Sequence, residues 1–155
     1  MTPDSLWFRA LDPVADAFNP ALTLLALAVL GLRGSWRGAW RGAWPGCPAA
    51  LRYVAAALAG LGVVYGVAAL DARFGLWSAL GLDYSTHTAY AVSLATTIAC
   101  WDRRWARPLA LALGGYALLI LLLGYHGPAD VLTAALVAAP GAWVAMKILG
   151  PRPAP

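Results

Sequence analysis

Charge is scarce in this sequence of 155 residues: charged side chains make up 12% of the chain, whereas 61% of it is hydrophobic. A soluble domain usually carries about 25% charged residues. So few polar side chains cannot cover a water-facing surface, and lipid must therefore cover much of the folded chain. The composition excludes an ordinary soluble protein and predicts a single membrane domain over residues 1–155.

Cysteine and histidine are equally scarce, with two residues of each. Cys47 and Cys100 are far apart and form neither a CxxC pair nor a metal-binding spacing, so we expect small apolar residues with reduced thiols. A cleavable signal peptide is not expected either. The first fifteen residues carry acids and lack a basic stretch followed by an apolar one.

Long apolar runs are what the chain has in abundance. Five runs approach or reach the roughly 20 residues that a membrane-spanning helix needs. They cover about 17–34, 49–70, 85–101, 106–125 and 128–149. Before them, residues 4–18 place apolar side chains on one helical face and contain Pro13, which predicts a short amphipathic helix on the membrane surface. The expected fold is an all-α bundle of about five transmembrane helices.

Basic residues gather on one side of these runs. Nine of the eleven fall near 33–52, near 101–107 or at the C-terminal end, with a single acid, Asp102, whereas the other side carries six acids. The positive-inside rule then places the C-terminus in the cytoplasm and the N-terminus outside, as in a bacterial inner membrane. Trp36, Trp40 and Trp44 recur beside arginines, so we expect lipid headgroups rather than nucleic acid as partners.

Both histidines fall on the extracytoplasmic side. His87 begins the third run and His126 follows the fourth, so one helical hairpin returns both imidazoles to the same face. Asp130 lies four residues after His126. In a phosphoryl-transfer site, neutral His126 would attack phosphorus and Asp130 would hold its tautomer. Protonated His87 would donate to the leaving oxygen.

Other polar residues surround these three. Ser85 and the free N–H groups of residues 86–88 would form an anion-binding helix N-terminus. Asp83, Tyr84 and Tyr125 would border the entry from the headgroup layer. Ordinary structural roles are the alternative, since serine caps helices and acids are favoured in a first helical turn.

Two segments carry a family resemblance. The sequences YSTHT at 84–88 and GYHGPADV at 124–131 resemble the second and third signature motifs of the type 2 phosphatidic acid phosphatase superfamily. In form they are most similar to the sphingomyelin synthase-like branch. The resemblance covers about residues 83–135, and the remaining helices resemble the family by hydropathy alone.

The resemblance implies a metal-free and cofactor-free lipid phosphatase or phosphotransferase. His126 would form a phosphohistidine, Asp130 would orient it, His87 would act as the acid, and Ser85 would contact the phosphate. The basic residues of the family's first and third motifs have no counterpart here, since Leu119 and Ile120 occupy the Ser-Arg positions of the third. Arg73 is then the basic residue expected near this face to bind phosphate.

Three other functions stay open. A catalytically degenerate member would serve as a membrane scaffold, forming a homo-oligomer or joining a larger complex. Alternatively, His87 and His126 would bind haem or zinc, with Asp130 as a ligand or second partner. Transport has little support, because no ionisable residue falls near the middle of a predicted span.

Overall fold

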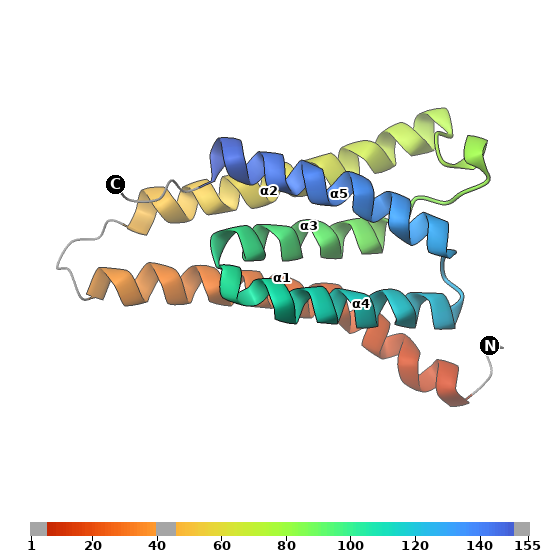
Figure 1. Cartoon of the computed structure of the whole chain (residues 1–155), viewed down its shortest axis with the longest axis horizontal. Coiled ribbons are helices and arrows are strands. Elements are labelled where there is room, and N and C mark those ends of the chain that lie inside the picture. The colour runs from red at the N-terminus through yellow and green to blue at the C-terminus, as the bar shows by residue number, and fades with distance from the viewer. Residues whose placement is uncertain (1–5, 40–45, 151–155) are drawn as a thin grey trace.

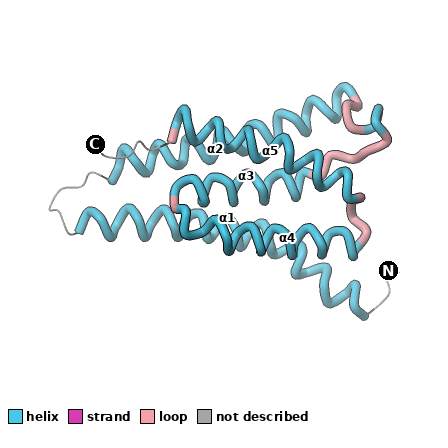
Figure 2. Tube along the Cα trace, in the orientation of Figure 1, coloured by secondary structure: helices cyan, strands magenta, loops and turns pink. Residues whose placement is uncertain are grey.

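The structure is a computed structural model that describes the backbone of residues 6–39 and 46–150, and the side chains of residues 6–31 and 49–150. The described backbone is helical and contains no strand, with two one-turn 3₁₀ helices in the loops (Figure 2). The elements are α1 (Leu6–Ala39), α2 (Gly46–Phe74), η1 (Ser78–Leu80), α3 (Thr86–Trp101), η2 (Arg103–Trp105), α4 (Ala106–Leu123) and α5 (Pro128–Leu149). The proposed tryptophan anchor of Trp36, Trp40 and Trp44 falls outside the described side chains.

Four segments of the described chain are long and apolar enough to cross a membrane: Leu6–Gly31, Ala49–Phe74, Arg103–Leu123 and Pro128–Leu149. The predicted all-α membrane bundle is thereby confirmed. The fifth helix, α3, has 16 residues. At 1.5 Å per residue it is about 24 Å long, less than the roughly 30 Å of a hydrocarbon core.

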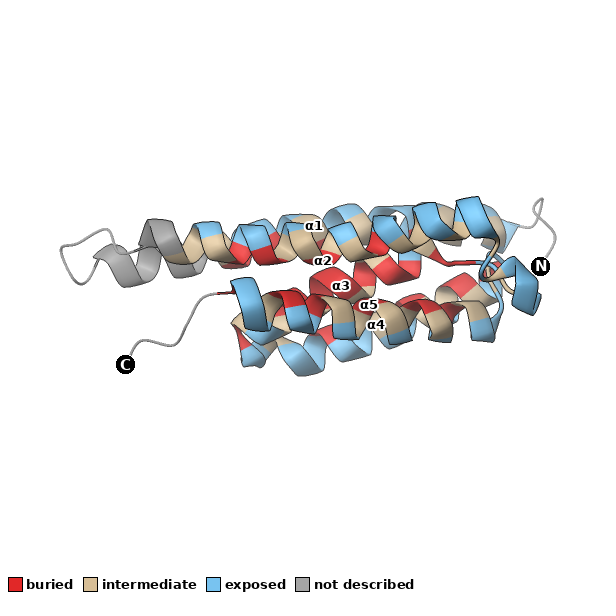
Figure 3. Cartoon of the chain, turned by 90° about the horizontal axis from the view of Figure 1, so that it is seen from above, coloured by how far each residue is buried: buried red, intermediate tan, exposed pale blue. Residues whose placement is uncertain are grey.

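The short helix α3 occupies the centre of the bundle and contacts all four others (Figure 1). Half of its residues are buried, including the polar Thr88, Ser93 and Thr97. Burial is concentrated on the surfaces that face this centre, whereas the outward faces of the long helices are exposed (Figure 3). The long helices therefore carry the lipid-facing surface, and α3 is sheltered among them.

Helix α1 differs from its prediction. Residues 6–39 form one continuous helix, where a separate surface helix over 4–18 and a first span were expected. Pro13 and Pro20 each remove one backbone hydrogen bond, which bends a helix without always ending it. Figure 1 shows the N-terminal segment of α1 angled away from the rest of the helix. The buried face runs on across the expected boundary, from Ala15 to Leu22.

Small residues allow α2, α3 and α5 to approach closely. Ala56, Ala134 and Ala142 are fully buried. A Cβ atom added to Gly60 of α2 would lie 2.9 Å from Oγ of Ser93 and 3.4 Å from Cα of Ala142. Helices in membranes associate through such small-residue contacts, because lipid tails remove the hydrophobic advantage of larger side chains.

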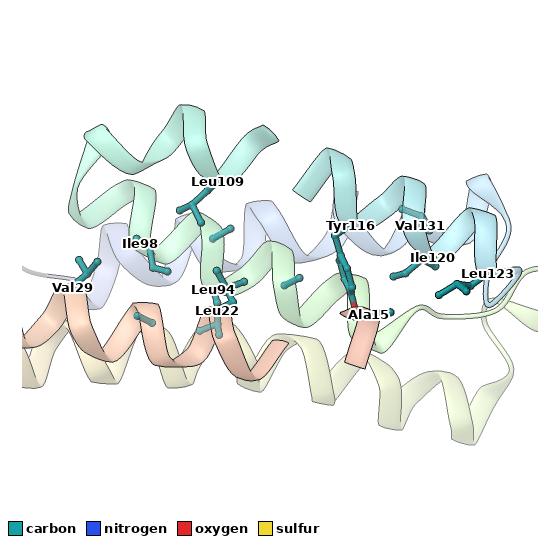
Figure 4. Close-up of a cluster of buried hydrophobic side chains, with 13 residues drawn as sticks. Ala15, Leu22, Val29, Leu94, Ile98, Leu109, Tyr116, Ile120, Leu123 and Val131 are labelled. Atoms are coloured by element: carbon teal, nitrogen blue, oxygen red, sulfur yellow. The ribbon is translucent and has the colours of Figure 1, made fainter. Parts of the chain in front are cut away.

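Larger side chains fill the other half of the bundle. Leu22 and Val29 of α1 pack with Leu94 and Ile98 of α3, and Leu109 of α4 closes the cluster (Figure 4). The bundle thus has a large-residue side around α1 and α4 and a small-residue side around α2 and α5. Helix α3 joins the two sides.

The loops that carry the candidate site lie at one end of the bundle. The α2–α3 loop and the α4–α5 loop are at the same end as the start of α1 (Figure 2). The hairpin of α3 and α4 therefore returns to the face from which it starts, as the sequence predicts.

Candidate functional site

Both histidines line one cavity of about 280 Å³. His87 comes from the first turn of α3, and His126 from the loop between α4 and α5. We call this the histidine cavity; its lining residues are Ala15, Asp16, His87, Tyr116, Ile120, Tyr125 and His126. Three separate parts of the chain thus meet at this hollow.

Helix α1 forms one wall of the histidine cavity through an aromatic contact. The ring of Phe18 stacks on Tyr116 of α4, with centroids 4.1 Å apart and planes at 8°. Tyr116 extends from α4 toward Ala15 of α1 (Figure 4). Another lining residue, Tyr125, meets the ring of Phe8 edge-on at 6.2 Å. Tyr125 therefore borders the cavity, and its role at an entry for substrate stays a prediction.

The carboxylate beside His126 belongs to Asp83. Its Oδ2 lies 3.3 Å from Nδ1 of His126. The Asp83 side chain is 76% exposed, whereas that of His126 is 15% exposed. Within the described chain, Nδ1 of His126 makes no hydrogen bond with this carboxylate or with any other group. This proximity would stabilise a positive charge on the imidazole. The sequence predicted Asp130 as the carboxylate in contact with His126. In the structure, Asp83 makes this contact instead.

Asp130 instead uses both carboxylate oxygens to hold the backbone. Its Oδ1 accepts from the N–H of Asp83 at 2.8 Å, and its Oδ2 accepts from the N–H of Gly127 at 2.7 Å. Gly127 caps α5 and Pro128 occupies the first helical turn, where its missing N–H costs nothing. Asp130 thus fixes the residue that follows His126 and the loop that carries Asp83.

Two residues predicted to meet the substrate are buried elsewhere. Ser85 is fully buried, and its Oγ donates to Oγ1 of Thr88 at 2.8 Å instead of facing a ligand. The hydroxyl of Tyr84 donates to the carbonyl of Val64 at 3.3 Å, and its ring meets Trp77 at 4.7 Å. Burial raises the pKa of Tyr84. Both residues stabilise the fold beside the site and do not line it.

Arg73, the predicted phosphate ligand, lies in the last turn of α2. Its guanidinium carbon is 5.7 Å from the ring centroid of its neighbour Phe74, and the side chain is exposed. Among the described side chains, no lysine or arginine lines the histidine cavity. The cations that the motifs lack are therefore not replaced from elsewhere in the described fold.

Asp16 is the residue that sequence reasoning missed. It lines the histidine cavity and also a wider neighbouring groove of about 790 Å³ between α1 and α3, which His87 shares. We call this the α1–α3 groove; its polar and aromatic lining residues are Asp16, Asn19, Thr23, Tyr65, His87 and Tyr90, beside Thr86 at the start of α3. The signal that could have indicated Asp16 was that the apolar face of α1 continues past this residue without a break.

Two polar contacts tie the groove together. Nδ2 of Asn19 donates to the carbonyl of His87 at 3.3 Å. The hydroxyls of Thr23 and Tyr90 share a hydrogen bond of 2.9 Å. These contacts hold α1 against the first turns of α3, and they place Asp16, one turn before Asn19, beside His87.

The site offers acid–base and nucleophilic chemistry. His126 is held near a carboxylate, and His87 opens to the same hollow. Within the described side chains, no group of three histidine, cysteine or acidic residues is arranged to hold a metal ion.

No family model, no curated protein and no solved structure matches this chain.

Proposed function

We propose that this protein is a membrane-embedded phosphatase or phosphotransferase acting on a lipid phosphate or phospholipid. One observation carries the proposal. His87 and His126 come from separate elements, line the same cavity, and have the Asp83 carboxylate 3.3 Å from Nδ1 of His126.

The proposed reaction begins with Nε2 of His126 attacking phosphorus. The bond between phosphorus and the leaving oxygen breaks as the bond to nitrogen forms, and His87 donates a proton to that oxygen. Asp83 stabilises the positive imidazole. Water or another alcohol then attacks phosphorus, its proton passes to His87, and the phosphorus–nitrogen bond breaks to restore His126.

The charge pattern supports an extracytoplasmic site. The basic side chains Arg52, Arg103, Arg104 and Lys147 lie toward the ends of helices opposite the histidine cavity. The positive-inside rule places that basic end, and the C-terminus, in the cytoplasm of a bacterial inner membrane. A substrate lipid would then enter from the outer leaflet, past Tyr125.

A second candidate is a non-catalytic scaffold that forms a homo-oligomer or a larger membrane complex. The observation that favours it is the absence of lysine and arginine among the described side chains that line the cavity. Phosphoryl transfer depends on stabilising charge on the phosphate oxygens, so this absence weighs against efficient turnover.

The test is release of phosphate or headgroup from a panel of lipid phosphates and phospholipids. His126→Ala and His87→Ala should each lower turnover by on the order of 10³-fold while thermal unfolding stays close to wild type. Arg73→Ala, which lies away from the cavity, is the control and should keep its activity. Full activity in His126→Ala would refute the nucleophile. Absence of turnover on every lipid would favour the scaffold, which copurifying subunits would then identify.

A further inference from the structure

The loop between α2 and α3 exposes large apolar side chains. Phe74, Leu76 and Leu80 are 66%, 45% and 75% exposed, and we call these three residues the loop patch. Residues 75–82 contain no charged side chain, although a connecting loop that faces water is usually polar. An exposed apolar patch of this kind marks a surface that a protein or a membrane covers.

The length of α2 places the loop patch outside the hydrocarbon core. The part of α2 that can cross a membrane covers 26 residues, Ala49–Phe74, and is about 39 Å long, against roughly 30 Å for the core. Between Arg52 and Asp71 no residue is charged, and this stretch is about 29 Å long. Asp71 therefore lies near the boundary of the core at the histidine end of the bundle, and the loop patch follows it in the headgroup layer.

Trp77 holds the loop against the bundle. Its backbone N–H donates to Oδ1 of Asp71 at 2.7 Å, and its indole N–H donates to Oγ1 of Thr133 on α5 at 2.9 Å. The backbone N–H groups of Leu80 and Leu82 both donate to the carbonyl of Trp77, at 2.9 and 3.0 Å. The loop is thus a folded unit with one side fixed to α5, and the loop patch stays exposed.

The loop patch continues a surface that lies in lipid. Leu70, one turn before Phe74, is exposed on the membrane-crossing part of α2. Leu132 and Leu136 are exposed on α5, the helix to which Trp77 is bonded. Figure 1 shows the loop at the end of α2, at the same end of the bundle as the α4–α5 loop. Lipid that covers these helices therefore reaches the loop patch without a gap.

We propose that the loop patch inserts into the leaflet at the histidine end of the bundle, at the depth of the headgroups and the first acyl carbons. Trp77 suits this depth, because tryptophan is enriched where a membrane meets water. The loop continues directly into Asp83, whose carboxylate lies 3.3 Å from Nδ1 of His126. The inserted patch therefore holds this pair at the membrane surface. This goes beyond the proposed phosphoryl chemistry, because insertion needs neither a bound substrate nor turnover.

Depth-dependent fluorescence quenching tests the insertion. Full-length protein with Leu80→Cys, and with Cys47→Ser and Cys100→Ser to remove the natural thiols, is labelled with a nitrobenzoxadiazole dye and placed in lipid discs of phosphatidylcholine. The quenchers are aqueous iodide and lipids that carry a nitroxide either near the headgroup or near the end of the acyl chain. The shallow nitroxide should quench the label at least about twofold more than the deep one, and iodide should quench it little.

Leu136→Cys, labelled in the same way, is the matched control inside the hydrocarbon core. This exposed leucine of α5 lies about 12 Å along the helix from Pro128, so the deep nitroxide should quench it more than the shallow one. The opposite order at the two positions would separate surface insertion from burial in the core.

Two further variants assign the insertion to the loop patch. Phe74→Gln combined with Leu76→Gln should lower shallow quenching of the Leu80 label by about half and open it to iodide, because insertion at an interface scales with the apolar area that is buried. Ser78→Gln adds the same side chain where a polar residue already stands, and quenching should not change.

Three outcomes would overturn the proposal. Quenching of the Leu80 label by iodide and not by lipid would place the loop in water. Protection from both would mean that a second copy or another protein covers the loop patch. Equal quenching in the double glutamine variant and in Ser78→Gln would show that the loop patch does not cause the insertion. Because the assay measures no turnover, loss of the enzymatic proposal leaves these results unchanged.

Discussion

The carboxylate of Asp130 accepts a hydrogen bond from the backbone N–H of Asp83, which lies 47 residues earlier, at 2.8 Å. Its other oxygen holds the N–H of Gly127. The two bonds join the α2–α3 loop to the start of α5. As a result, the side chain of Asp83 makes the close contact with His126, whereas Asp130 interacts with His126 only through its charge.

Asp130→Ala removes both acceptors, and we expect the free energy of unfolding to fall by roughly 1–2 kcal/mol. Asp130→Asn keeps one carbonyl acceptor and should fall between Ala and wild type. Thermal unfolding in neutral detergent measures the order of the three proteins. An unchanged midpoint in Asp130→Ala would show that these bonds are not needed to join the loop to α5.

Asp83→Asn tests the charge beside His126 separately from the fold. The variant keeps the backbone N–H that binds Asp130, and the side chain is 76% exposed, so stability should change by less than about 0.5 kcal/mol.

In the lipid-release assay, Asp83→Asn should lower turnover on the order of tenfold, because the imidazole loses its nearby counter-charge. If Asp83→Asn keeps the turnover of wild type while Asp130→Ala clearly loses stability, the α2–α3 loop has only a structural role.

The helices could be predicted because their bounds depend on local sequence: the length of each apolar run and the residues at its two ends. The predicted run 128–149 coincides with α5, and 85–101 differs from α3 by one residue, since Pro128 and Ser85 mark their starts. The first helix could not be bounded in this way. Pro13 suggested a break, but tertiary packing of the face through Ala15 and Leu22 sustains the helix across it.

The site was predictable only as far as topology decides it. Because α3 and α4 form one antiparallel hairpin, the chain returns to the end from which it started, which brings His87 and His126 to the same end of the bundle. The partner of His126 depends on a contact between residues 47 apart, which no local spacing reveals, and nearness in sequence favoured Asp130. Ser85 shows a related limit, because burial turned its hydroxyl toward Thr88 and away from any ligand.

Gly60→Ala tests the close approach of α2 to α3 and α5. The new Cβ would meet Oγ of Ser93 at 2.9 Å and the backbone of Ala142 at 3.4 Å, so we expect a loss of about 1–3 kcal/mol.

Gly62→Ala is the matched control on the same helix, since a Cβ there meets nothing within 4 Å. It should be neutral or more stable by up to about 1 kcal/mol, because alanine favours helix. Thermal unfolding of the pair decides the point. Equal effects at the two positions would contradict the packing of α2 described above.

Tyr84→Phe gives a prediction for pH. At neutral pH the variant loses the hydrogen bond to the carbonyl of Val64, and we expect a cost of up to about 1 kcal/mol. Burial first, and the charge of Asp71 second, raise the pKa of Tyr84 in the folded protein above its ordinary value of 10.0. Below that value neither state is ionised, so the stability difference between the two proteins should be constant.

Above that value the unfolded wild type loses the proton before the folded one does. Wild type therefore loses stability relative to Tyr84→Phe as the pH rises from the ordinary pKa through the folded one. Unfolding midpoints of both proteins, measured from neutral to alkaline pH, give the difference directly, and ionisation of the other tyrosines cancels in it. A difference that stays constant throughout would mean that Tyr84 ionises as readily in the folded protein, which its burial against Trp77 and Val64 opposes.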